Sequence, residues 1–262
     1  MGKIISINIQ KGGCGKSTTV QSLAGSLHEY GYKCLVVDLD PQGNLTYSSG
    51  IQETKYTIYE FLKEECSFDE AVQVNKYYDI LPANISLSGA DKEFTGEGKE
   101  IILRCALEKV KEKYDYIILD TPPSMGILTI NSLTACDFVI IPMEPSFYAF
   151  HALEQLYETI NNIKLQYNSN LKILGILLVK YKEKNSLNQF VSALTERFVR
   201  QKDLKVFQNA IEENMIYCES QGLQQNIFEC YPESEPCYDY QLFTDEVLDD
   251  VHQEEKMVKV IG

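Results

Sequence analysis

The chain has 262 residues and a formal net charge of −14, which comes from 24 basic and 38 acidic side chains. This charge excludes a histone-like polycation, and 44% hydrophobic residues are too many for a disordered chain. There is no run of 18 apolar residues that would cross a membrane, and the first residues lack a signal-peptide pattern. We therefore expect a cytoplasmic protein that forms a single domain over residues 1–262.

Short apolar runs alternate along the chain with stretches of helical period, which predicts an α/β fold. In chain order, the predicted strands are Ile4–Ile9, Cys34–Val37, Tyr78–Leu81, Tyr116–Leu119, Phe138–Ile141, Ile173–Val179 and Leu204–Phe207. Most are continuous aliphatic runs, which are typical of strands that are covered on both faces. The pattern favours a doubly wound, mainly parallel sheet with helices on both faces.

Three stretches between these runs repeat apolar residues at helical spacing, and we interpret them as helix faces directed at the core. They are Val20, Leu23, Ala24 and Leu27; Leu153, Leu156, Tyr157 and Ile160; and Leu187, Phe190, Val191, Leu194 and Phe198. The eight cysteines form no Cys-x-x-Cys pair, so we expect reduced thiols and neither a zinc site nor a disulfide framework.

A glycine-rich segment joins the first predicted strand to the first helix. It consists of Lys11, Gly12, Gly13, Cys14, Gly15, Lys16, Ser17 and Thr18. In this context the segment predicts the phosphate-binding loop of a P-loop NTPase: glycines turn backbone N–H groups toward phosphate, Lys16 reaches the β- and γ-phosphates, and Ser17 offers a hydroxyl to Mg²⁺. Gln10 stands where the standard loop has its first glycine, and Lys11 adds a second lysine. Lys11 is either an extra cation for the triphosphate, which we favour, or a solvated surface lysine.

Carboxylates follow two of the predicted strands, at the edge where α/β sheets place their chemistry. Asp120 ends an apolar run and suits the Walker B position, which orients Mg²⁺ and its waters. Asp38 and Asp40 come before Pro41 and are read as a nucleotide-sensing switch, although either alone could serve as a helix cap or turn former.

Taken together, these motifs resemble the ParA/MinD family of ATPases, which carry a deviant Walker A motif. Lys11–Thr18 resembles that motif, Val37–Asn44 the first switch, Leu81–Ala90 a further family segment and 120–124 the second switch. Similarity continues through Ile141–Leu153 and, weakly, to about Leu248, so it covers nearly the whole chain.

The resemblance implies a Mg²⁺-dependent ATPase, slow and stimulated by a ParB-type partner, that switches in plasmid or chromosome partitioning. It implies an ATP-sandwiched homodimer in which Lys11 contacts the nucleotide held by the other subunit, so the expected catalytic residues are Lys11, Lys16 and Asp40. Asp40 would position the attacking water, while Ser17, Asp38 and Asp120 would support Mg²⁺. By family analogy, the adenine base lies near residues 211–214.

One of the basic stretches of the DNA-binding relatives is changed in this sequence. The stretch 181–184 keeps positive charge, whereas Glu212 and Glu213 stand where basic residues are expected, which should weaken non-specific DNA binding. Residues 172–205 nevertheless hold eight basic and three acidic side chains. The candidate DNA contacts are Lys180, Lys182, Lys184, Arg197 and Arg200, with Lys202 and Lys205 as further cations; solvated helix faces explain them equally well.

Two alternatives therefore stay open beside a DNA-binding switch that would associate with the nucleoid. One is a ParA-like, nucleotide-gated module that positions protein cargo without touching DNA, and the other is a metabolic P-loop ligase, for which the sequence shows no substrate motif. The acidic end 247–255 would be repelled by an anionic membrane, so we expect no membrane binding. The loop begins at residue 11, so we expect no N-terminal DNA-reading domain.

Overall fold

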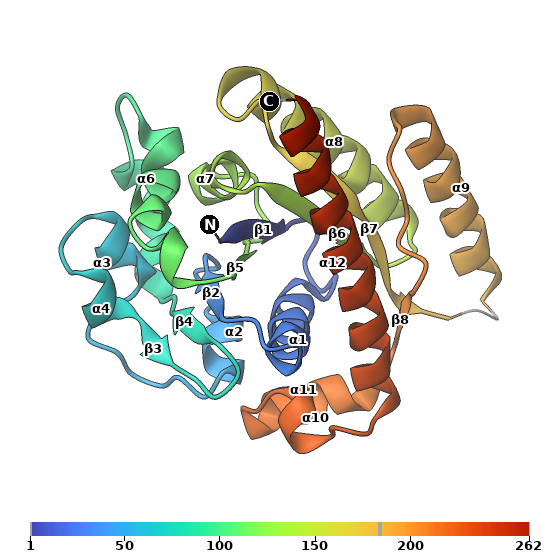
Figure 1. The fold of residues 1–262 in the computed structure, drawn as a ribbon, viewed down its shortest axis with the longest axis horizontal. Coiled ribbons are helices and arrows are strands. Elements are labelled where there is room, and N and C mark those ends of the chain that lie inside the picture. The colour runs from blue at the N-terminus through green and yellow to red at the C-terminus, as the bar shows by residue number, and fades with distance from the viewer. Residues whose placement is uncertain (1, 183–184, 262) are drawn as a thin grey trace.

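Within residues 2–182 and 185–261, which the computed structural model describes, eight strands form a sheet in the order β3-β4-β2-β5-β1-β6-β7-β8 (Figure 1). The strands are β1 (Lys3–Ile7), β2 (Cys34–Asp38), β3 (Gln73–Val74), β4 (Asp79–Leu81), β5 (Tyr116–Asp120), β6 (Phe138–Met143), β7 (Lys172–Tyr181) and β8 (Ile211–Glu212). All neighbours pair in parallel except β3, which runs antiparallel to β4. The mainly parallel sheet of the P-loop NTPase fold is thereby confirmed.

Helices cover both faces of the sheet, as expected (Figure 1). They are α1 (Lys16–Glu29), α2 (Asn44–Ser48), α3 (Ile58–Leu62), α4 (Phe68–Ala71), α5 (Ala90–Glu93), α6 (Ile102–Glu108), α7 (Ile127–Ala135), α8 (Phe147–Gln166), α9 (Ser186–Lys202), α10 (Met215–Leu223), α11 (Ile227–Cys230) and α12 (Glu235–Ile261), with 3-10 turns η1 (Ile85–Gly89), η2 (Lys99–Ile101) and η3 (Lys111–Lys113).

Alternation along the central strands divides the core into two layers. In β1, Ile4 packs in the layer formed with α6, α7 and α8, whereas Ile5 and Ile7 pack in the layer formed with α1 and α12. Because both layers are apolar, each central strand reads as a continuous aliphatic run. The two layers hold the carboxyl ends of β1, β2 and β5 together at one edge, where the predicted site lies.

The predicted strand Leu204–Phe207 is wrong: this segment makes a single bridge, from Val206 to Ile176 of β7. Just beyond it, the Glu246 carboxylate of α12 accepts the backbone N–H groups of Gln208 (2.9 Å) and Asn209 (3.0 Å), so these two groups do not extend the pairing with β7. The short strands β3 and β8 were not predicted. Their two-residue length leaves no periodicity to detect.

One of the three predicted helix faces is only partly buried. The stripe on α1 is fully buried, and Leu153, Leu156 and Ile160 of α8 are buried. On α9, however, Leu187 and Phe190 are 44% and 54% exposed. They lie in the first turns of that helix, where the Phe190 ring rests against Phe147 at the start of α8, 5.9 Å between centroids, instead of reaching the core.

The long helix α12 lies along α1, and the two are dark red and blue in Figure 1. Its apolar side, with Tyr240, Phe243, Val247 and Val251, is buried in the core. No helix in the described ranges is both long and apolar enough to span a membrane. The apolar face of α12 is therefore already occupied within the fold.

Candidate functional site

The glycine-rich loop leads from β1 directly into the amino end of α1, as its sequence predicts. Gly13 and Gly15 have φ values of 73° and 67°, in the left-handed region that favours glycine, and Gly15 forms the N-cap of α1. This conformation turns successive N–H groups inward next to the positive end of the helix dipole. The loop is thus shaped to receive the oxygens of a phosphate chain.

Lys16 is the first residue of α1 and is only 7% exposed. Its Nζ donates a hydrogen bond to the carbonyl oxygen of Lys11 at 3.3 Å, so the side chain folds back over the loop. Burial lowers the pKa of Lys16, while the nearby Asp120 and Asp40 carboxyls oppose that shift. The ammonium group therefore lies between the phosphate loop and the acidic residues of the sheet edge.

Asp38 and Asp120 end the adjacent strands β2 and β5 and are direct register partners. Both are buried, and neither carboxyl oxygen of Asp120 has a hydrogen-bond partner among the described residues. Burial, together with the Asp38 carboxyl, raises the pKa of Asp120 to about 8, against the opposing effects of Ser17 and Lys16. Buried carboxylate oxygens without partners, beside a serine hydroxyl, match the hard oxygen donors that Mg²⁺ prefers.

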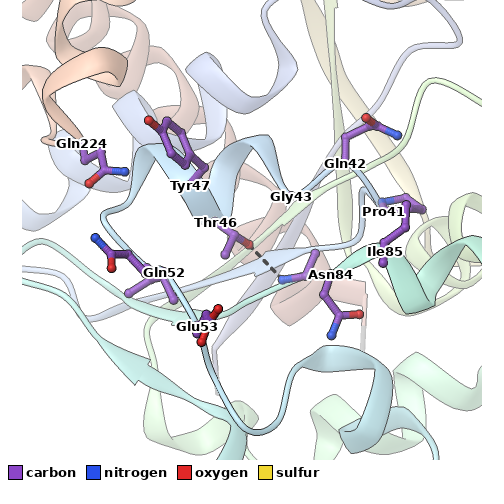
Figure 2. A pocket seen from close by; sticks show the side chains of 12 residues that line it. Pro41, Gln42, Gly43, Thr46, Tyr47, Gln52, Glu53, Asn84, Ile85 and Gln224 are labelled. Carbon is purple, nitrogen blue, oxygen red and sulfur yellow. Dashed lines mark hydrogen bonds between the residues drawn. The ribbon is translucent and has the colours of Figure 1, made fainter.

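Asp38 is held in place by Thr46 of α2, a residue that the sequence did not single out. The backbone N–H and the hydroxyl of Thr46 both donate to Asp38 Oδ2, at 2.9 and 2.7 Å, and the Asp40 N–H donates to Oδ1 at 3.0 Å. The Thr46 hydroxyl in turn accepts the Ala83 N–H at 2.8 Å (Figure 2). Burial raises the pKa of Asp38 to about 6 despite these bonds. In the sequence, the only sign of this role for Thr46 is that a hydroxyl residue stands eight positions after Asp38.

Asp40 begins a tight turn and is half-buried. Its Oδ1 accepts the Gln42 N–H at 3.0 Å, and its carbonyl accepts the Gly43 N–H at 2.9 Å. Asp40 is close enough to Lys16, Asp38 and Asp120 to influence their pKa values. The structure therefore brings the two predicted catalytic residues Lys16 and Asp40 together with the predicted metal-binding carboxylates.

Lys11 points away from this group, toward the amino end of α8. Its Nζ forms an ion pair with Glu144 Oε2 at 2.9 Å and donates to the Ser146 hydroxyl at 3.0 Å. Ser146 is also the N-cap of α8. Neither partner was assigned a role from the sequence, although both lie within the family-like segment Ile141–Leu153. In this structure, Lys11 is held by residues of its own chain.

The predicted DNA contacts separate into two groups. Lys180 and Lys182 lie at the carboxyl end of β7, whereas Arg197 and Arg200 lie about 16–21 Å further along α9, judged from 1.5 Å of rise per residue. Lys184 lies outside the described residues. Lys182 pairs with Glu213 at 2.5 Å, and Arg200 pairs with Glu196 at 3.3 Å. Two of the described cations are therefore partly neutralised.

Comparisons with known proteins place the chain among its relatives. Residues 2–173 match the family model described as an AAA domain. The chain is 39% identical over 220 residues to the sporulation initiation inhibitor protein Soj of Bacillus subtilis, covering 82% of this chain and 86% of Soj. It is 37% identical over 246 residues to the chromosome partitioning protein ParA of Myxococcus xanthus, covering 92% and 86% of the two chains.

Among solved structures, the chain is similar to a cobyrinic acid a,c-diamide synthase from Mycobacterium smegmatis with bound ADP and magnesium. The TM-score is 0.82, the sequence identity is 31%, and the match covers 95% of this chain and 94% of the synthase chain. That neighbour links this fold to binding of a nucleotide and magnesium.

Proposed function

Because the chain belongs to the ParA/MinD family of ATPases, we propose that it binds and hydrolyses ATP with Mg²⁺ and that ATP drives it from monomer to homodimer. The observation that carries this proposal is the buried pair Asp38 and Asp120: within the described part of the chain the Asp120 carboxyl has no hydrogen-bond partner, and Lys16 is close enough to influence its pKa. When bound, Mg²⁺ neutralises charge on the β- and γ-phosphates. Residues 1–262 act as one ATPase unit in this proposal.

Each residue of the site has a separate role. Ser17, Asp38 and Asp120 hold the metal and its waters, and the loop residues 11–18 bind the phosphates. Lys16 stabilises charge that develops on the γ-phosphoryl group, and Asp40 orients the attacking water. Lys11 leaves Glu144 and reaches the nucleotide of the second subunit, so that dimerisation depends on ATP.

Hydrolysis assays test this assignment. Lys16→Ala and Lys11→Ala should each lower turnover by about 10²-fold or more, as the removal of one charge-stabilising donor does elsewhere. Lys92→Ala, which changes an exposed lysine on α5, serves as the matched control. Hydrolysis that survives in Lys16→Ala refutes the ATPase assignment.

Light scattering tests the switch directly. Asp40→Ala should accumulate as a dimer with ATP and Mg²⁺, because hydrolysis is blocked while the nucleotide stays bound. A variant that remains monomeric under these conditions would contradict the proposed dimer.

The similarity to Soj and to ParA supports a role in partitioning DNA. We place non-specific DNA binding on the exposed cations Lys180, Lys182, Arg197 and Arg200, and propose that a ParB-type partner stimulates hydrolysis. A gel shift with the ATP-bound dimer should then show binding that weakens steeply with salt, since phosphate contacts release counterions.

The ion pair between Lys182 and Glu213 favours a second candidate, a nucleotide-gated module that positions protein cargo without DNA. In a DNA-binding protein, Glu213→Gln should free Lys182 and tighten DNA binding. Glu212→Gln removes the same charge from the preceding residue, and serves as control because no bond between Glu212 and Lys182 is seen in the described structure. If the dimer binds no DNA at low salt even in Glu213→Gln, the cargo function replaces the DNA function.

A further inference from the structure

The second switch, residues 120–124, is held by its neighbours at both ends. At its start, the Thr121 hydroxyl donates to the carbonyl oxygen of Ile7 in β1 at 2.8 Å. At its end, the carbonyl oxygen of Ser124 accepts the hydroxyl of Thr129, in the first turn of α7, at 2.7 Å. The position of the second switch therefore depends on where the amino end of α7 lies.

The amino end of α7 is capped by a side chain from another part of the sequence. The N-cap residue is Gly126, which has no side chain to accept a hydrogen bond. Asp91, in α5, accepts instead: its Oδ1 receives the Ile127 N–H at 2.7 Å. A carboxylate at this point satisfies an N–H that has no partner within the helix, and it lies at the positive end of the helix dipole. Asp91 thus holds the first turn of α7 from outside the helix.

Gly126 leaves room for the Asp91 carboxyl. A Cβ atom built on Gly126 would lie 2.7 Å from Asp91 Oδ2 and 3.0 Å from Oδ1. The φ of Gly126 is −114°, which any residue can adopt, so the backbone conformation does not require glycine. A side chain at this position would push the carboxyl away from the Ile127 N–H. The bare backbone of Gly126 is therefore what allows Asp91 to reach the helix.

The segment that carries Asp91, residues 83–91, also reaches the first switch. At its start, the Ala83 N–H donates to the Thr46 hydroxyl at 2.8 Å, and that hydroxyl donates to Asp38 Oδ2 at 2.7 Å (Figure 2). One short segment is therefore bonded to the support of Asp38 at one end and to the support of the second switch at the other.

Segment 83–91 is fixed to the core between these two ends. It consists largely of η1, which leads directly into α5. Leu87 in η1 and Ala90 in α5 are each 1% exposed and pack in the core layer that also contains Ile127. Because a helical segment with a close-packed middle has few other arrangements, its two ends keep a fixed separation.

We propose that Asp91 is a positioning residue for ATP hydrolysis, which holds the second switch in register with the first switch through segment 83–91. Asp91 acts through the Ile127 N–H and α7 and not on the nucleotide. Its effect on turnover rests on the proposed ATPase function, whereas its effect on the second switch does not. The phosphate loop keeps its own conformation without Asp91, so the residue should affect kcat and leave KM for ATP unchanged.

Steady-state kinetics test the role in hydrolysis. Asp91→Ala should lower kcat about 2- to 30-fold, the range expected if the loss of a helix cap adds to the barrier. Asp91→Asn keeps an oxygen acceptor and should restore most of kcat; Asp91 is exposed, so neither change opens a cavity in the core. Asn185→Ala is the matched control, because Asn185 caps α9 by accepting the Leu187 N–H at 2.9 Å. The control should keep the wild-type kcat.

Three kinetic outcomes would overturn the proposal. The first is a wild-type kcat in Asp91→Ala. The second is an equal loss of kcat in Asp91→Ala and Asn185→Ala, which would show that the loss of any helix cap lowers the folded fraction. The third is an Asp91→Asn variant as slow as Asp91→Ala, because the lost hydrogen bond would then not be the cause.

Fluorescence follows the two switches without hydrolysis. The chain contains no tryptophan, so Met125→Trp beside the second switch and Tyr47→Trp beside the first each provide a single reporter, at side chains that are 38% and 61% exposed. After mixing with Mg²⁺ and a non-hydrolysable ATP analogue, the two reporters should change at the same rate, but at different rates when Asp91→Ala is added. Equal rates in both backgrounds, or no response at the second switch, would overturn the coupling. Failure of the ATPase assignment is seen separately, as hydrolysis that survives in Lys16→Ala.

Discussion

The ion pair between Lys11 and Glu144 should oppose dimerisation, because the proposed dimer needs Lys11 at the neighbouring nucleotide. The pair has an Nζ–Oε2 distance of 2.9 Å, and the two side chains are 26% and 38% exposed. Ion pairs with this degree of exposure contribute about 0.5–1 kcal/mol. A homodimer breaks two of them, so the cost is about 1–2 kcal/mol, which corresponds to about 5- to 30-fold in the dimer dissociation constant.

We therefore expect Glu144→Gln to tighten the ATP-dependent dimer by up to this factor. Sedimentation equilibrium with Mg²⁺ and a non-hydrolysable ATP analogue measures the dissociation constant without interference from turnover. Glu158→Gln, an exposed carboxylate further along α8, has the same charge change and should leave the constant unaltered. A dimer that is unchanged or weaker in Glu144→Gln would refute the idea that Lys11 must be released from its own chain.

Three further changes should have measurable effects. Asp120→Asn should raise the free energy of unfolding of the nucleotide-free protein, because burying a carboxyl that has no hydrogen-bond partner among the described residues is costly. The same change should abolish the stability that Mg²⁺ and ATP add. Denaturant titrations with and without both ligands measure the two effects. Burial and the nearby Glu235 raise the pKa of Asp239 to about 6. The contribution of Asp239 to stability is therefore present below about pH 4 and lost as the pH rises through 6. Asp239→Asn should raise the Tm relative to the wild type at pH 8, and this difference in Tm should shrink toward pH 4. Gly25→Ala should destabilise the protein by about 1–3 kcal/mol in thermal unfolding, although alanine normally stabilises a helix, because the new Cβ would lie 2.4 Å from Asn226 Oδ1.

The central fold could be predicted because its signals are local. Most buried strands are continuous aliphatic runs, and helices such as α1 carry a regular apolar stripe. The exceptions depend on contacts across the sequence: the Gln208 N–H, just after the predicted strand Leu204–Phe207, bonds to Glu246, which lies 38 residues away in the chain. Phe190 is likewise exposed and rests against Phe147 of α8, a contact that helical periodicity does not encode.

The candidate site divides in the same way. The phosphate loop and the carboxylates after β2 and β5 are short motifs in their expected context, so their residues could be named from the sequence. The direction of the Lys11 side chain could not be predicted, because its partner Glu144 lies 133 residues away in the sequence and a lysine side chain has many rotamers. Thr46 was missed because its role depends on Ala83, on a different segment.

Charge placement explains why any DNA binding by this acidic chain should require ATP. Lys182 pairs with Glu213 and Arg200 with Glu196, so two of the four described candidate cations of one chain are partly neutralised. The salt dependence of DNA affinity scales with the number of phosphates neutralised, and the proposed dimer would double the number of cations available to neutralise them. Once the first subunit of a dimer is bound to DNA, the second subunit binds the same DNA at a high effective concentration, which increases the overall affinity. Two weakly binding subunits joined by ATP would then bind DNA where a single subunit does not, and hydrolysis would release both subunits from the DNA.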